Sequence, residues 1–134
     1  MNLMNHPEEV TQLVAALDSG TQSTRCFLFD INMHAVACHN EPITQVYPHA
    51  GWVEHDPCEV AEKSKVCMAM ALSLAQEKLG PVKVVSIGIT NQRETTIVWS
   101  KTTGLPLYNA VVWSVSASCL RPVFEASRAQ STSH

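Results

Sequence analysis

The feature that most constrains the fold is the stretch Leu13–Asp30, in which two short apolar runs flank a polar bend. The runs LVAAL and CFLF occupy residues 13–17 and 26–29. Both are too short for helices and lack helical spacing, so we predict that they are strands of a buried sheet. Residues 18–25 then form the connection between the two strands.

This connection contains the residue types of a phosphate-binding loop. Gly20 permits backbone angles that are closed to other residues. Hydroxyl groups and backbone amides are donors that suit an oxyanion, and four hydroxyls stand close to Gly20. They belong to Ser19, Thr21, Ser23 and Thr24. Asp18, at the end of the first strand, is placed to hold a metal ion through water.

The alternative is a hairpin with a polar tip, because Asp, Ser, Gly and Thr are ordinary turn residues. A Walker loop is excluded, since no lysine follows Gly20.

Composition bounds the class of protein. A length of 134 residues suits one small domain or part of a larger one. With 46% hydrophobic and 16% charged residues, the chain is expected to form a core. A net charge of −3 offers no basic face, which argues against a nucleic-acid partner. The five cysteines form no CxxC pair and indicate a reduced, cytoplasmic setting. We expect neither a targeting peptide in residues 1–12 nor a membrane span.

The clearest predicted element is a helix from about Pro57 to Leu79. Asp56 is the predicted N-cap, Pro57 the first helical residue and Glu59 the acid of a capping box, while Gly80 and Pro81 end the pattern. An apolar stripe repeats at helical spacing between these limits, and we expect it to pack on a sheet face rather than on a membrane or a partner. The stripe consists of Val60, Cys67, Met70, Ala71 and Leu74.

Further strands are predicted before and after the helix. They cover residues 34–39, 82–89, 95–99 and 107–113. Turns are expected at 30–33 and 101–104, and the strand at 82–89 is expected to be buried. The order of elements predicts an α/β fold with a mixed sheet and one long helix on one face.

Two charged residues follow the strand 82–89 just past its carboxyl end, where open α/β sheets bind ligands. Arg93 and Glu94 together offer five donors and two acceptors, which suits the orientation of vicinal hydroxyls on a polyol. The alternative is a surface ion pair worth about 0 to 1 kcal/mol, with no functional role.

Two other groups of residues carry weaker signals. His49, His55 and Asp56 have metal-ligating side chains, but a helix-entry loop ordinarily contains such residues and the remaining ligands are missing. Ser19, His55 and Asp18 have the composition of a hydrolase triad, but no nucleophile elbow surrounds the serine.

Four segments resemble the glycerol kinases of the FGGY carbohydrate-kinase family in order and spacing. They are LDSGTQSTR at 17–25, GWVEHDP at 51–57, IGITNQRETTIVW at 87–99 and GLPLYNAVVW at 104–113. The NQRET block is the most specific of the motifs. The resemblance implies a partial ribonuclease H-like domain of the superfamily that includes actin, hexokinase and the heat-shock ATPases.

The resemblance also implies roles for individual residues. ATP and Mg²⁺ would be bound, with Asp18 helping to place the metal. The residues implied in binding the nucleotide's phosphates are Asp18, Gly20, Thr21, Gln22, Ser23 and Arg25. Arg93 and Glu94 would hydrogen-bond the hydroxyls of glycerol, and Trp113 would cover its carbon backbone. The implied reaction transfers the γ-phosphoryl group of ATP to glycerol and yields glycerol 3-phosphate.

The resemblance covers residues 13–113 and ends there. We expect residues 1–12 to be flexible and residues 114–134 to be a divergent, disordered tail. The family's catalytic aspartate lies further downstream, so no catalytic residue is assigned here. We therefore expect a truncated glycerol kinase, inactive on its own. The alternative is a non-catalytic remnant that binds polyol or phosphate weakly or associates with a full-length kinase.

Overall fold

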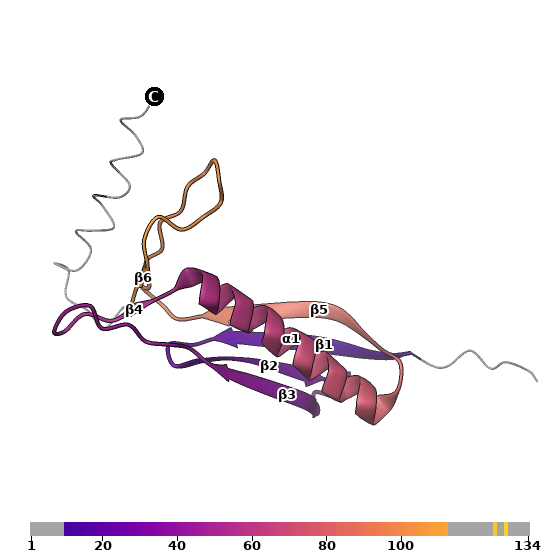
Figure 1. Cartoon of the computed structure of the whole chain (residues 1–134). Helices are drawn as coiled ribbons and strands as arrows, with labels where there is room; N and C mark the ends of the chain where they lie inside the picture. The colour runs from indigo at the N-terminus through magenta and orange to yellow at the C-terminus, as the bar shows by residue number, and fades with distance from the viewer. Residues whose placement is uncertain (1–9, 113–124, 126–127, 129–134) are drawn as a thin grey trace, which may run out of the picture.

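A computed structural model, which describes residues 10–112, 125 and 128, contains a four-stranded sheet. One long helix lies across one face of this sheet (Figure 1). In spatial order the strands are β3 (Ala35–Pro42), β2 (Ser23–Phe29), β1 (Thr11–Ser19) and β5 (Val82–Asn91). β2 runs antiparallel to both of its neighbours, whereas β1 and β5 are parallel. The predicted mixed sheet is confirmed.

The first two strands are longer than predicted, which shortens the polar bend. The cross-strand pairs Asp18–Arg25 and Ser19–Thr24 continue the β1–β2 ladder into the segment expected to be a loop. Only residues 20–22 remain outside the strands. The predicted turn at 30–33 is confirmed, with the Met33 N–H donating to the Asp30 carbonyl at 3.0 Å.

The helix α1 spans Pro57–Leu79, as predicted. Asp56 Oδ1 accepts the Cys58 N–H at 2.8 Å, and the Gly80 N–H donates to the Gln76 carbonyl at 2.9 Å with a Gly80 φ of 74°. Glu59 is used differently from the predicted capping box. Its Oε1 accepts the Thr44 hydroxyl at 2.8 Å, because the segment after β3 lies against the first turn of the helix.

The main core lies between α1 and the sheet. Its buried residues are Leu13, Ala15, Leu17, Cys26, Leu28, Ala37, Cys67, Ala71 and Ala75. Cys67, Ala71 and Ala75 recur every four residues and define the face of α1 that contacts the sheet. Met70 was predicted on this face but is 43% exposed, because its position lies about 100° around the helix from Ala71.

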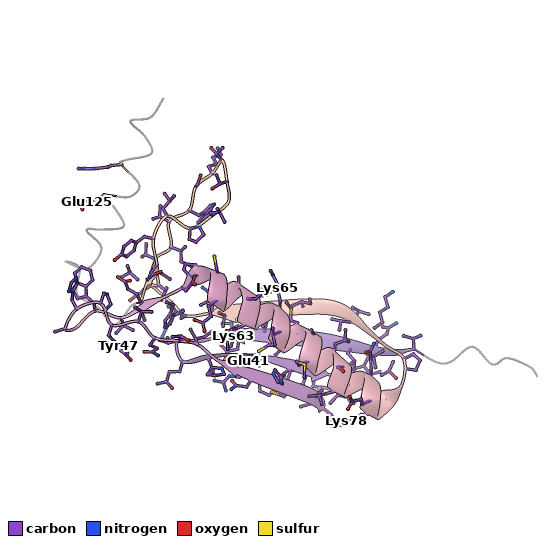
Figure 2. All side chains as sticks on the ribbon, in the orientation of Figure 1. Glu41, Tyr47, Lys63, Lys65, Lys78 and Glu125 are labelled. Atoms are coloured by element: carbon purple, nitrogen blue, oxygen red, sulfur yellow. The ribbon has the colours of Figure 1, made fainter. Side chains whose placement is uncertain are left out.

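Polar contacts hold α1 over the β2–β3 side of the sheet (Figure 2). Lys63 Nζ lies 3.2 Å from Glu41 Oε2, and Lys78 Nζ donates to the Val36 carbonyl at 2.8 Å. Hydrogen bonds from His39 and Lys63 lower the pKa of Glu41. Because α1 lies mainly over β2 and β3, it leaves β5 largely uncovered.

The prediction that the strand at 82–89 is buried is wrong for the described residues. Ile87 is 51% and Ile89 71% exposed. β5 is the edge strand of the described sheet and pairs only with β1. α1 packs mainly on β2 and β3, toward the other edge of the sheet. An apolar sequence run specifies a strand here, but its burial depends on what else covers it.

A second, small sheet pairs β4 (Glu54–His55) with β6 (Ala110–Val111). The strands predicted at 95–99 and 107–113 reduce to β6 and two isolated bridges, Thr96–Val111 and Trp99–Pro106, in the described part of the chain. Pro106 lacks an N–H and so cannot extend a ladder. The turn predicted at 101–104 is confirmed by a 2.7 Å hydrogen bond from the Gly104 N–H to the Ser100 carbonyl.

The small sheet encloses polar side chains. Glu54 is 2% exposed and its carboxylate accepts the Tyr108 hydroxyl and the Asn109 amide, each at 3.0 Å. Burial, together with this contact to Glu54, raises the pKa of Tyr108. His55 is fully buried, and its desolvation lowers the pKa of the imidazole while nearby Glu59 acts in the opposite direction.

The described residues can be compared with the expectations of reduced cysteines and of no membrane span. Cys26, Cys38, Cys58 and Cys67 carry no disulfide. Burial raises the pKa of the Cys26 and Cys67 thiols. Within residues 10–112, 125 and 128 we find no helix whose length and apolar character would suit a bilayer-spanning segment.

The N-cap can be tested by a pair of substitutions. Asp56→Ala removes the acceptor for the Cys58 N–H and is expected to lower the free energy of unfolding by about 1 kcal/mol. Asp56→Asn keeps a capping oxygen and is expected to lose only a fraction of that. Urea denaturation of both variants measures the difference, and an unchanged free energy of unfolding in Asp56→Ala would show that the cap contributes nothing.

The burial of His55 predicts acid sensitivity. Because its folded-state pKa lies below the ordinary 6.5, stability is fully present above pH 6.5 and falls as the pH drops toward the folded-state value. The slope for one proton is at most about 1.4 kcal/mol per pH unit. Denaturation midpoints between pH 7.5 and 5.5 should therefore fall more in the wild type than in His55→Gln. An identical pH dependence would contradict the assignment.

Candidate functional site

The bend after β1 and the turn after β5 face one cleft. Because β1 and β5 are parallel neighbours, their last residues, Ser19 and Asn91, pair at the same edge of the sheet. The cleft has a volume of about 400 Å³. It is lined by Asp18, Gly20, Thr21, Asn91, Gln92, Arg93 and Glu94. The structure thus brings the two predicted halves of the site together.

Backbone contacts fix the shape of the bend. The Gly20 N–H donates to the Ser23 carbonyl at 3.0 Å, and a Cβ on Gly20 would lie 3.1 Å from that same oxygen. A side chain at this position would displace the Ser23 carbonyl by a few tenths of an ångström. Gly20 does not have a positive φ, so this close approach, and not the unusual backbone angles expected from the sequence, is what favours a glycine here. From the segment after β3, the Ile43 N–H donates to the Gln22 carbonyl at 2.9 Å. A tight bend with little room for a side chain at Gly20, beside an accessible carboxylate, fits the cradle that a metal–phosphate group requires.

Asp18 and Arg25 form an ion pair across the β1–β2 ladder. Arg25 Nε lies 3.3 Å from Asp18 Oδ2, and the two side chains are 47% and 42% exposed, respectively. An exposed pair of this kind contributes about 0 to 1 kcal/mol. Of the predicted phosphate-binding residues, Gln22, Ser23 and Arg25 lie outside the cleft lining, and Arg25 reaches it through Asp18.

The turn after β5 presents two charged side chains. Arg93 and Glu94 are exposed, and in the described part of the chain neither forms an ion pair, which removes the support for the surface-pair alternative. Glu94 has a φ of 61°, a left-handed conformation that is uncommon for a residue with a side chain. Such strained residues cluster at functional sites.

The structure does not assemble the other candidate sites of the sequence analysis within the described residues. Trp113 lies outside the described residues. No group of metal-ligating side chains occurs among the residues that the structure describes, and His49 instead packs edge-on against Trp52 with ring centroids 5.0 Å apart. The triad geometry is also absent there, because His55 contacts Gln92 and Asp18 contacts Arg25.

Asn91 and Gln92 also line the cleft, although the sequence analysis assigns neither of them a role. Their position in the NQRET block, between the strand and the charged pair, was the available signal. The Gln92 N–H donates to the Ser19 carbonyl at 3.0 Å, which joins the two halves of the site directly.

Comparisons with known proteins agree with this geometry. Residues 13–123 match the model of the FGGY family of carbohydrate kinases, N-terminal domain. The chain is 51% identical over 102 residues to a glycerol kinase of Arabidopsis thaliana, covering 75% of this chain and 20% of that protein. It is 47% identical over 105 residues to a glycerol kinase of Pseudomonas savastanoi pv. phaseolicola, covering 78% and 21%. The chain spans about one fifth of the length of these curated relatives.

Solved structures show the same fold. Plasmodium falciparum glycerol kinase with ADP superimposes with a TM-score of 0.77 at 36% identity, covering 87% of this chain and 23% of that one. Xylulose kinase from Rhodospirillum rubrum gives 0.71 at 25% identity, covering 82% and 23%. The predicted fold class is confirmed. The chain belongs to the FGGY family of carbohydrate kinases and matches part of that family's N-terminal domain.

Proposed function

We propose that this chain carries the phosphate-facing and polyol-facing side of a glycerol kinase site. The complete site would transfer the γ-phosphoryl group of ATP to glycerol and form glycerol 3-phosphate. The observation that carries the proposal is the single cleft shared by Thr21 and Arg93. The glycerol kinases at 47–51% identity support glycerol as the substrate over other polyols.

On the phosphate side, the bend at Gly20 would receive the nucleotide's phosphates. Mg²⁺ supplies charge neutralisation on the phosphates when it is bound. Asp18 would hold that ion through water, and Arg25 would turn from Asp18 toward a phosphate oxygen. Their ion pair is exposed and weak, so exchanging it for these partners costs little. Thr21, Gln22 and Ser23 would add hydroxyl, amide and backbone contacts.

On the polyol side, Arg93 and Glu94 would bind neighbouring hydroxyls of glycerol. A guanidinium donates to two oxygens in a fixed geometry, and a carboxylate accepts from the same hydroxyls. Both side chains are exposed and form no ion pair within the described residues, so binding a ligand breaks no ion pair there. Trp113 is proposed, on the family resemblance, to cover the carbon backbone.

We assign no general base to this chain, since the resemblance puts that aspartate downstream of the matched segment. The 134 residues are therefore proposed to bind both ligands without turning them over. The cysteines of the described residues carry no disulfide, which fits the cytoplasm as the proposed compartment.

A second candidate function is association with a full-length kinase. The open face of β5, with Ile87 51% and Ile89 71% exposed, favours it. Exposed apolar side chains on an edge strand invite pairing with another chain.

Nucleotide binding can be tested by calorimetric titration of the whole chain with Mg·ADP. Asp18→Asn is expected to weaken binding about 10-fold or more, because a charge-assisted contact contributes about 1.5–3 kcal/mol. Glu62→Gln, which alters an exposed carboxylate of α1 paired with Lys65, is the matched control and should keep the wild-type affinity. Equal affinities of Asp18→Asn and wild type would refute the role of Asp18.

Glycerol binding depends on Arg93 in this proposal. Arg93→Ala is expected to weaken glycerol affinity about 10-fold or more and to leave Mg·ADP affinity unchanged. Arg93→Lys keeps the charge without the planar fork and should fall between the two. Lys101→Ala, in the exposed turn, is the control. A coupled assay of the wild-type chain should detect no glycerol-dependent ADP production. Production above the level of Arg93→Ala would show that the chain is catalytic and would contradict the proposal that it only binds its ligands.

A further inference from the structure

The turn that carries Arg93 and Glu94 is held on both sides. Before it, the Gln92 side chain reaches His55 of β4, with Nε2 3.3 Å from Nδ1. After it, Thr96 and Val111 of β6 exchange two backbone hydrogen bonds of 3.0 Å. Because β4 and β6 pair with each other, both contacts lead to the same small sheet. This sheet is therefore the support on which the turn rests.

His55 is a rigid anchor. Its side chain is fully buried, its backbone pairs with Ala110, and its neighbour Glu54 is gripped by two hydrogen bonds from the 108–109 segment. On its other side Asp56 caps α1. An imidazole fixed by a sheet and a helix start cannot follow Gln92 if the turn moves, so it restrains the glutamine.

The pair is also incompletely satisfied. His55 Nε2 and Gln92 Oε1 are buried and lack a hydrogen-bond partner among the described residues. A buried polar group without a partner costs about 1–3 kcal/mol, so an apolar contact here would serve stability better. Gln92 Oε1 is sealed from solvent although the residue lines the cleft. Gln92 would therefore act on a ligand through Arg93 and Glu94 rather than by touching it.

The turn needs such support because of its backbone. Glu94 adopts a φ of 61°, which costs about 1–2 kcal/mol for a residue with a Cβ. Without restraint the segment would relax to a right-handed or extended conformation and redirect both charged side chains.

We propose that Gln92 is a positioning residue, oriented by His55, that holds Arg93 and Glu94 toward the polyol side of the cleft. This inference rests on the proposed role of these two residues in glycerol binding. With Gln92 Nε2 as the donor, Nδ1 of His55 accepts and the proton of the neutral ring sits on Nε2. Burial lowers the pKa of His55, which agrees with a neutral ring.

Two measurements on the whole chain test the proposal. In calorimetric titrations, Gln92→Leu and His55→Leu should each weaken glycerol binding about 2- to 10-fold, the equivalent of one hydrogen bond, and leave Mg·ADP binding unchanged. The double variant should lose no more than either single one, because both remove the same contact. His55→Gln keeps an acceptor and should restore much of the affinity.

The control separates positioning from mere stability. Tyr108→Phe removes a hydrogen bond to Glu54 in the same small sheet without touching Gln92. It should lower the denaturation midpoint but leave glycerol affinity intact. An equal loss of affinity in Tyr108→Phe would overturn the proposal.

Nitrogen-15 NMR without ligand gives an answer that does not depend on the proposed function. The wild-type His55 ring should show the Nε2–H tautomer. His55→Leu, which is remote in sequence from the turn, should shift the backbone amide signals of Arg93 and Glu94 through its contact with Gln92. Gln92→Asn, one methylene too short to reach His55, is the milder variant if Gln92→Leu does not fold. Unshifted amide signals would overturn the proposal. Shifted signals in a chain that binds no glycerol would refute the proposed function and leave the positioning contact standing.

Discussion

The parallel pairing of β1 with β5 is the constraint on which the site depends. Parallel neighbours end at the same edge of a sheet, so the bend after Ser19 and the turn after Asn91 meet without any contact designed between their side chains. Such a pairing requires a crossover, and α1 supplies it by burying Cys67, Ala71 and Ala75 against the sheet. The hydrophobic core thus fixes the position of polar residues that lie outside it.

The segments at the cleft are shaped mainly by backbone hydrogen bonds. Gly20 bonds Ser23, and Gln92 bonds Ser19. Because backbone hydrogen bonds hold these segments together, charged side chains such as that of Arg93 are not needed for this and stay exposed. A site built in this way pays little to exchange water for a ligand, since few side-chain contacts have to break.

Local signals were the ones that could be interpreted from the sequence. Asp56, Pro57 and Gly80 specify where α1 begins and ends because capping involves neighbouring residues. The bend and the charged pair were found for the same reason. The exposure of β5 could not be predicted from its own residues, since it depends on which part of the sheet α1 covers. Glu59 was assigned to a capping box, but Thr44, 15 residues earlier in the chain, competes for its carboxylate.

The contact between Gln92 and His55 illustrates the same limit at the candidate site. These residues lie 37 positions apart, and neither belongs to a pattern that points to the other. Their meeting requires α1 to return the chain to the sheet and β6 to fix β4 beside it. Charged residues on a turn can be recognised locally, whereas the buried polar contact proposed to aim them is a product of the tertiary fold. Positioning residues of this kind are therefore found by asking which buried polar atoms near a cleft lack a partner.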